Sequence, residues 1–359
     1  MTNIRLGHVV ARVLGFALAV SAHVGAASTG EVSSAVVKDW CTVDPARAAA
    51  RSILESASRH RDDHPHALAH VHTEGTLPHQ GIRDQSLEAE VDWQVALRAA
   101  LAWQVGHDPR YLRQVDAYLL AWAGTYEPDF NPIDETNLDA LIEAYALTRR
   151  ALHPPTRAAM QALLHKLGEG YLERMHALSR SLRGSEVNNW QSHRIKLVAL
   201  AGAALGDGAL LQEATLLFQQ QVAGNIHADG SVHDFSERDA LHYVVYDLQP
   251  LVQAAVAVKP YASVDDWLHY ETAAGASLAK ALDWLRPYAD GSRSHEEFVH
   301  SKVKFDAVRA QAGVSGFSGL WDPRTGTALY WLAARLDPRY LAVAKKLSAQ
   351  PPDWIGVCR

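Results

Sequence analysis

EVNNWQSHRIKLVALAGAALG, residues 186–206, is the stretch that decides the fold. Its apolar residues recur at the spacing of a helix, Ala and Leu dominate it, and Gly206 stands where a helix would end. The alternation of apolar and polar residues that is typical of a strand is scarce. We therefore expect a helix over residues 186–206.

The rest of the chain repeats this helical spacing, with Gly- and Pro-containing pairs between the segments. Short connections favour antiparallel neighbours, and the absence of a fixed repeat period disfavours an open superhelix. No linker divides the chain. The sequence predicts an all-α protein, with one (α/α) toroid or incomplete barrel of about six antiparallel helical hairpins over residues 28–359. We expect helices near residues 44–60, 86–105, 109–123, 134–151, 155–181, 186–206, 209–226, 236–258, 264–286, 295–313, 324–334 and 338–348.

Composition excludes several classes of protein. The chain has 359 residues, 48% hydrophobic and 21% charged, which is typical of a globular protein and not of a disordered one. Its net charge of -6 and the lack of a basic stripe disfavour nucleic acid as a partner, whereas an acidic polysaccharide could bind in a locally basic cleft. We interpret His64, His66, His70 and His72 as a solvated helix end and predict neither a metal site nor a cofactor.

The first 27 residues resemble an export signal. Arg5 and Arg12 flank a short charged region, residues 13–20 are apolar, and small residues offer cleavage near Ala27 or Ser28. The apolar run falls short of the roughly 20 residues that span a bilayer, and no later run is long enough. We therefore expect a periplasmic or secreted protein with no membrane span.

The chain has two cysteines, Cys41 and Cys358. An oxidising compartment would favour a disulfide that joins the first mature segment to the tail. Two buried free thiols are the alternative, because the sequence does not show whether the two Cα atoms lie within about 7 Å.

Polar residues cluster at the start of the quoted stretch. If the helix begins at Glu186, then Asn189 and His193 lie one turn apart, and Glu186 shares their side. Asn can donate to a carboxylate, His can give or take a proton near neutral pH, and Glu can orient it. The alternative is that Asn188 or Asn189 only caps the helix.

A second polar cluster lies fifty residues later. On a continuous helix, Arg238 and His242 are spaced i, i+4, as are Asp239 and Tyr243, and Tyr246 follows at i+3. A cation beside a tyrosine favours the phenolate, so we expect an acid–base tyrosine whose pKa is lowered by arginine. The alternative is a charged surface face with a tyrosine anchored in the core.

At these residues the chain resembles the alginate lyase family, helical-toroid lyases that cleave polyuronates. Asn188-Asn189 is similar to the first half of the family's Asn-Asn-His motif, and Ala240-Leu-His-Tyr243-Val-Val-Tyr246 to its Ala-Leu-x-Tyr-x-x-Tyr stretch. The resemblance implies β-elimination at a 4-linked uronic acid, giving a 4,5-unsaturated sugar.

The resemblance also implies residue roles. Asn189, assisted by Asn188, would hold the substrate carboxylate, and His193 would neutralise that carboxylate or act as base. Tyr243 would be the acid and could also be the base, and Arg238 would stabilise negative charge. From their place in the same two clusters, we expect Glu186, His242 and Tyr246 to contact substrate.

Two departures indicate a divergent branch. The family histidine follows the second asparagine directly, whereas three residues separate Asn189 from His193. The family arginine also sits further before the tyrosine than Arg238 sits before Tyr243. Alginate, glucuronan or another uronan could therefore be the substrate, and Tyr246 competes with Tyr243 for proton transfer.

Residues 71–86 contain Gly, Pro and Thr and predict a long loop before a helix, with Ser86 as its N-cap. Because such loops often contact substrate, we place His79, Gln80 and Arg83 among the substrate-binding residues.

Two functions of other classes stay open at this stage. A glycoside hydrolase on the same toroid would need two carboxylates about 5–9.5 Å apart, for which Glu186, Glu237 and Asp239 are the candidates. A non-catalytic protein would bind uronans and release no unsaturated ends.

Overall fold

The computed structural model describes residues 37–178, 186–261 and 266–359. The predicted export signal over residues 1–27 lies outside them. Over the described ranges the regular elements are helical, with three isolated β-bridges. The α-helices are α1 (Ala48–Arg59), α2 (Arg83–Gly106), α3 (Pro109–Thr125), α4 (Asp139–Thr148), α5 (Pro154–Leu178), α6 (Asn189–Leu205), α7 (Gly208–Asn225), α8 (His233–Arg238), α9 (Leu241–Val258), α10 (Leu278–Ala289), α11 (Lys304–Gln311), α12 (Thr327–Leu336), α13 (Leu341–Leu347) and α14 (Asp353–Gly356), and the 3-10 helices are η1 (Thr136–Leu138), η3 (Pro323–Gly326) and η4 (Pro338–Tyr340).

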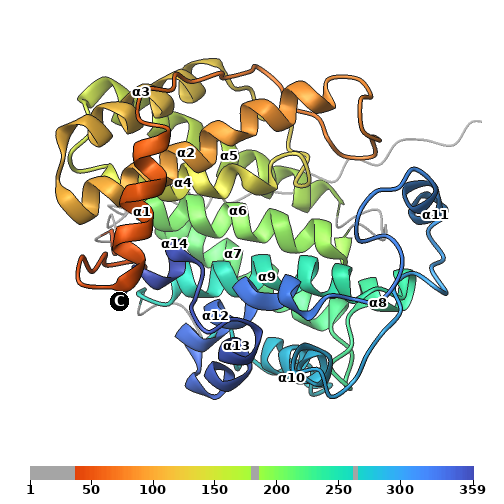
Figure 1. The fold of residues 1–359 in the computed structure, drawn as a ribbon. Coiled ribbons are helices and arrows are strands. Elements are labelled where there is room, and N and C mark those ends of the chain that lie inside the picture. Colours follow the sequence, from red (N-terminus) through yellow and green to blue (C-terminus); the bar gives the residue numbers. More distant parts are fainter. Residues whose placement is uncertain (1–36, 179–185, 262–265) are drawn as a thin grey trace, which may run out of the picture. The chain divides into compact units, whose positions relative to one another are not determined.

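Helices pack in two layers (Figure 1). One row runs α2, α4, α6, α9, α12, each helix contacting the next, and α3, α5, α7, α10 and α13 pack outside this row. Helices α6 and α9 are buried along almost their whole length, because their neighbours in the row and helices of the outer layer both cover them. The quoted stretch is thus a central helix, and its polar side chains need partners inside the protein.

Most predicted helices are confirmed to within a few residues, and three predictions need correction. The segment predicted over 236–258 forms two helices, α8 and α9. The segments predicted over 264–286 and 295–313 become helical only at Leu278 and Lys304. Residues 262–265 lie outside the described ranges. Helix α14 was not predicted, because four residues carry no periodic signal.

The break between α8 and α9 is made by a distant segment. Asp239 adopts a left-handed conformation, with φ of 48°. Its carbonyl oxygen accepts a hydrogen bond from the Phe298 amide, and its carboxylate accepts one from the His300 amide. Glu297 caps α9 by accepting from the amides of Leu241 and His242 at 2.7 and 3.0 Å. The i, i+4 argument across residues 238–243 was therefore wrong, since no helix spans them.

Helix starts otherwise follow the chemistry of the sequence. Side chains of Asn188, Asp207 and Ser277 accept from the first-turn amides of α6, α7 and α10, as capping residues do. Ser86 was wrongly expected to cap α2. The helix already begins at Arg83, and the Ser86 hydroxyl bonds the Ile82 carbonyl and the His72 amide instead.

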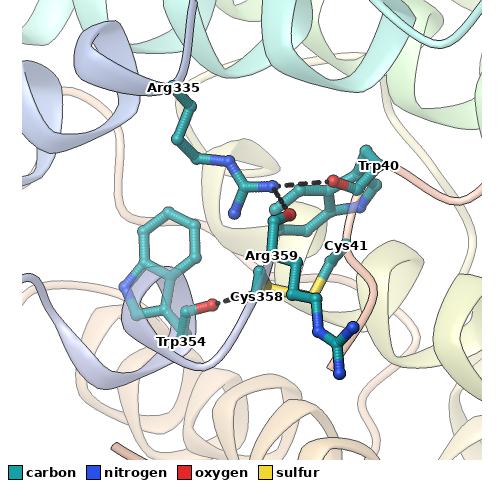
Figure 2. The surroundings of a disulfide bond; sticks show 6 residues. All are labelled: Trp40, Cys41, Arg335, Trp354, Cys358 and Arg359. Atoms are coloured by element: carbon teal, nitrogen blue, oxygen red, sulfur yellow. Dashed lines mark hydrogen bonds between the residues drawn. A yellow bond between two sulfur atoms is a disulfide. The ribbon is translucent and has the colours of Figure 1, made fainter. Parts of the chain in front are cut away.

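A disulfide joins Cys41 to Cys358, which are 317 positions apart in sequence and whose Cα atoms lie 4.9 Å apart (Figure 2). The predicted pair is confirmed, and the alternative of two free thiols is wrong. Around it, Arg335 donates to the carbonyls of Trp40 and Arg359 at 3.0 and 2.8 Å. The bond closes a loop of nearly the whole described chain and so lowers the conformational entropy of the unfolded state. This loss of entropy stabilises the folded state by about 4–5 kcal/mol.

Candidate active site

A cavity of about 240 Å³ opens among the inner helices. It is lined from η1, α4, α6, α9 and η3, so four separate regions of sequence contribute to it. The polar lining residues are Thr136, Asn137, Asp139, His193, Lys196, His242, Tyr246, Gln249, Gln253 and Thr325. Three predicted site residues, His193, His242 and Tyr246, therefore face one hollow.

His193 lies on α6 and is 3% exposed. Its Nδ1 is 2.7 Å from the Thr136 hydroxyl, and its Nε2 has no hydrogen-bond partner among the described residues. Burial, reinforced by the charge of Lys196, lowers the pKa of His193 well below its usual value. The imidazole is neutral at physiological pH, so it can accept a proton but carries no charge with which to neutralise a carboxylate.

Tyr246 lies against His193, with ring centroids 4.4 Å apart. Burial raises the pKa of Tyr246 well above that of a free tyrosine, and the Thr136 hydroxyl opposes this rise. Pro250 follows one turn later in α9 and has no N–H, so the Tyr246 carbonyl lacks its usual helical donor. Interaction with that carbonyl raises the pKa of His193 against the effect of burial.

Lys196 holds Thr136, the residue that contacts His193. It lies one turn after His193 on α6 and is 3% exposed. Its Nζ donates to the Thr136 carbonyl at 2.6 Å, to the Thr136 hydroxyl at 3.3 Å and to the Asp139 carboxylate at 2.7 Å. The Asp139 pairing compensates the buried charge, and Lys196 fixes the hydroxyl that touches His193.

Tyr243 occupies a different setting, although it is less than one turn from Tyr246. Its hydroxyl accepts a hydrogen bond from Arg309 at 3.0 Å, and the Arg238 guanidinium lies over its ring at 3.9 Å. Asp306, 1% exposed, holds both arginines. We call Arg238, Tyr243, Arg309 and Asp306 the arginine clamp.

The expected lowering of the Tyr243 pKa is wrong. Tyr243 is 7% exposed, and burial raises its pKa, while Arg238 and Arg309 only oppose the rise. Desolvation of the phenolate outweighs the attraction of the two cations. Tyr243 also lies outside the lining of the His193 cavity.

The side chains of the two asparagines of the first motif form hydrogen bonds within the protein. Asn188 caps α6 by accepting from the Trp190 amide at 3.0 Å, as the capping alternative held. Asn189 is 1% exposed, and its amide group donates to Asp234 at 2.8 Å. Asp234 in turn lies 3.8 Å from Arg238, so Asn189 connects to the arginine clamp rather than to the cavity.

Glu186 does not join His193. Helix α6 starts only at Asn189, because Asn188 caps it, so the expected shared helix face does not form. Glu186 lines a separate cavity beside α5 and α7. Of the other proposed carboxylates, Glu237 pairs with Lys302 at 3.2 Å, and Asp239 anchors the 298–300 backbone. None of the three lines the His193 cavity.

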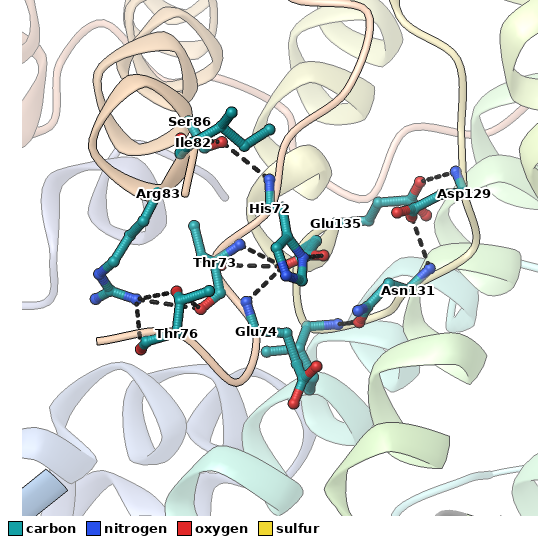
Figure 3. Close-up of polar contacts among 12 residues, drawn as sticks. His72, Thr73, Glu74, Thr76, Ile82, Arg83, Ser86, Asp129, Asn131 and Glu135 are labelled. Atoms are coloured by element: carbon teal, nitrogen blue, oxygen red, sulfur yellow. Dashed lines mark hydrogen bonds and ion pairs between the residues drawn. The ribbon is translucent and has the colours of Figure 1, made fainter. Parts of the chain in front are cut away.

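Hydrogen bonds to one buried carboxylate hold the 71–86 loop, whose residues His72, Thr73 and Glu74 are drawn in Figure 3. Asp134, 1% exposed, accepts from the backbone amides of Thr73 and Glu74, each at 2.7 Å, and contacts His72 Nδ1 at 2.9 Å. The hydrogen bond to Asp134 raises the pKa of His72. The loop is thus an ordered part of the fold at the start of α2.

The loop residues predicted to contact substrate make local bonds. Arg83 donates to the Thr73 carbonyl at 3.1 Å, and the Gln80 side chain accepts from the Leu77 amide at 3.0 Å. His79 Nδ1 lies 2.6 Å from the Asp84 carboxylate. None of the three lines the His193 cavity, and their contact with substrate stays a prediction.

Sequence reasoning missed Thr136, Lys196 and Arg309 as site residues. Lys196 carried a signal, since a lysine three residues after His193 follows it on the same helix face. Thr136 and Arg309 carried none, because they reach the site from elements 57 and 66 residues away from their partners. Within the described ranges, no group of three or more His, Cys, Asp or Glu side chains could hold a metal ion, and no helix is apolar and long enough to cross a membrane.

Comparison with known proteins identifies relatives at the level of family and fold. A sequence model described as alginate lyase matches residues 37–295. No curated protein sequence matches significantly. Among solved structures, an alginate lyase from Bacteroides ovatus is 15% identical with a TM-score of 0.58, covering 84% of this chain and 90% of that one.

Two structures of alginate lyase A1-III are also similar. The enzyme from Sphingomonas species A1 is 16% identical with a TM-score of 0.54, covering 81% of this chain and 95% of that one. A histidine-to-alanine variant complexed with a tetrasaccharide is 18% identical with a TM-score of 0.54, covering 81% and 94%. At these identities the likeness shows the fold, and the expected all-α toroid is confirmed.

Proposed function

The chain belongs to the alginate lyase family and is therefore a polysaccharide lyase, and we propose that it cleaves a 4-linked polyuronate by β-elimination, with His193 and Tyr246 transferring the protons. One observation carries this assignment of roles. The two rings lie 4.4 Å apart on the wall of one cavity, one neutral and the other protonated at neutral pH. A base and an acid are thus side by side where a sugar can enter.

The hydrogen-bond network supports this division of labour. We assign Nδ1 of His193 as the donor to the Thr136 hydroxyl, which leaves the lone pair on Nε2 as the proton acceptor. Lys196 also donates to the Thr136 hydroxyl, so both lone pairs of that hydroxyl oxygen are used. The proton of the Thr136 hydroxyl then points to Tyr246. Thr136 therefore sets the histidine as acceptor and stabilises a tyrosinate.

The reaction follows from these roles. His193 Nε2 takes the proton from C5, the C4–O4 bond breaks as the C4–C5 double bond forms, and Tyr246 gives its proton to O4. His193 is then charged and Tyr246 is anionic. Because the rings are neighbours, a proton returned from His193 to Tyr246, directly or through one water, resets both groups for the next cycle.

Substrate preference follows from the placement of acid and base on one wall. Both protons move on the same face of the sugar, which requires C5–H and C4–O4 to share that face. D-Mannuronate and D-glucuronate meet this requirement, and L-guluronate, the C5 epimer of mannuronate, does not. We expect cleavage of polymannuronate or glucuronan and none of polyguluronate.

The arginine clamp lies outside the lining of the His193 cavity, so we assign it charge stabilisation at long range rather than direct contact with the substrate. Removal of the C5 proton puts negative charge on the substrate carboxylate, and preorganised cations favour that charge. Arg309 lowers the pKa of Tyr246 against burial, so its charge acts at the cavity wall. Arg238 and Arg309 are fixed by Asp306 and need no reorganisation during the reaction.

The test is an assay of purified protein on polymannuronate, polyguluronate, glucuronan and hyaluronan. The expected result is a new ultraviolet absorbance, from the unsaturated product, with polymannuronate or glucuronan. His193→Gln serves as the inactive control, because it keeps the polar contact with Thr136 and lacks a basic nitrogen. New reducing ends without ultraviolet absorbance would indicate a hydrolase and overturn the proposal.

Export belongs to the same proposal. The leader-like first 27 residues and the Cys41–Cys358 disulfide both support an oxidising compartment, periplasmic or extracellular. Determination of the N-terminus of protein secreted or released from the periplasm checks it, with Ala27 or Ser28 as the expected first residue.

A further inference from the structure

A second cavity of about 240 Å³ lies between α1, α2 and α14. Helix α1 packs on α2 and on α14 (Figure 1), and residues of all three helices line the cavity. It shares no lining residue with the His193 cavity, whose walls come from η1, α4, α6, α9 and η3. Nothing in the proposed chemistry uses it.

Two arginines line this second cavity and have no anionic partner. Arg59 on α1 is exposed, Arg98 on α2 is half-buried, and neither forms a hydrogen bond or ion pair with any described residue. Most other arginines near helix ends here are paired, as Arg110 is with Asp108. A half-buried guanidinium without a partner retains its donors for a ligand, and its planar fork fits a carboxylate.

The rest of the lining suits a sugar ring. Trp354 on α14 is half-buried and provides an aromatic surface, while Gln94 and Ser56 provide an amide and a hydroxyl. Asp353, the acidic lining residue, accepts from the Ser52 hydroxyl at 2.5 Å, so its charge is partly compensated. Aromatic surface, neutral hydrogen-bonding groups and two cations are the groups that recognise an acidic saccharide.

The disulfide fixes the position of α14, the third helix that lines this cavity. Cys358 lies two residues beyond α14, and the Cys41–Cys358 bond fixes this tail to the segment before α1 (Figure 2). An antiparallel bridge between Val43 and Cys358 adds to the connection. Trp354 is therefore held beside Arg59 and Arg98 by a covalent bond near the chain's C-terminal end.

We infer that this second cavity, which we call the Arg59–Arg98 cavity, is a non-catalytic binding site for a uronate unit of an acidic oligosaccharide. The arginines bind the carboxylate, and Trp354 packs against the ring. The site rests on the proposed function only for the choice of saccharide.

Binding stoichiometry tests the inference. Tyr246→Phe protein, whose turnover should be slowed about 10²–10⁴-fold, is titrated with a mannuronate tetrasaccharide by calorimetry, and two sites per chain are expected. Adding Arg59→Gln and Arg98→Gln should reduce the stoichiometry to one. Arg51→Gln is the matched control, because Arg51 is an exposed α1 arginine outside the cavity, paired with Glu55, and should leave two sites.

A second variant links the site to the disulfide. Cys41→Ser with Cys358→Ser should weaken the arginine-dependent site at least tenfold and leave the other site unchanged, measured below the variant's melting temperature. One site in the Tyr246→Phe parent, two sites retained in the double-arginine variant, or equal binding of neutral mannotetraose would each overturn the inference. Because binding is read without turnover, failure of the lyase assay alone leaves this test intact.

Discussion

Tyr246 and Tyr243 are three residues apart on α9, yet they occupy opposite kinds of environment. Tyr246 lies on a cavity wall beside a neutral histidine, whereas Tyr243 is clamped between two arginines away from that cavity. Local spacing alone makes both equal candidates for proton transfer. Access to substrate distinguishes them, and access is decided by which face of α9 the cavity meets.

The largest expected effect is that of Tyr246→Phe. Removing the hydroxyl removes the acid that protonates O4, so kcat should fall about 10²–10⁴-fold. The ring remains, so packing against His193 and the melting temperature should change little. Initial rates on the preferred polyuronate measure this, and activity within threefold of wild type would reassign the acid to Tyr243.

Tyr243→Phe should have a smaller effect on rate and a larger one on stability. The variant removes the Tyr243 hydroxyl that accepts from the half-buried Arg309 guanidinium, which costs about 1–3 kcal/mol. We expect kcat to fall less than about tenfold, since one supporting contact is lost and not the proton donor. Urea unfolding and initial rates measured on one preparation give both numbers. A larger loss of kcat in Tyr243→Phe than in Tyr246→Phe would indicate that Tyr243, and not Tyr246, is the proton donor.

Lys196→Met tests the electrostatics beneath the His193–Tyr246 pair. The Lys196 charge lowers the pKa of His193, so removing it raises that pKa, and Asp139, left unpaired, raises it further. His193 must be neutral to accept a proton, so the acidic limb of the kcat/KM profile should move to higher pH. The double variant Lys196→Met with Asp139→Asn should move it less. An unmoved limb in both variants would exclude His193 as the base.

Asn189→Ala should change stability and leave the pH profile alone. It removes a buried donor to Asp234, which then lacks one hydrogen bond, at a cost of about 1–3 kcal/mol. Because Asp234 adjoins Arg238, a modest loss of rate is expected through the arginine clamp. A rise in KM of more than tenfold with unchanged stability would instead support direct binding of the substrate carboxylate by Asn189.

Helical periodicity predicted most of the fold, and its failure at residues 236–258 has a clear cause. The break at Asp239 depends on Glu297 and residues 298–300, which lie about sixty residues away in sequence. Windowed periodicity sees only local spacing, so it extends a helix through any segment with suitable residues. Glu186 was misplaced for a different reason, because Asn188 caps α6 and the helix begins only at Asn189.

By itself the sequence determined the all-α class, the two candidate cysteines and the two polar clusters, because these follow from residue type and local spacing, whereas the structure decided that the cysteines are bonded. Only the tertiary structure decided which polar residues share a cavity. The pKa of Tyr243, which the sequence predicted to be lowered, is raised by burial. Burial also lowers the pKa of His193, so this side chain is neutral. Desolvation depends on every element packed around a group, and η1, α11 and η3 reach the site from parts of the chain whose local sequence contains no sign of it.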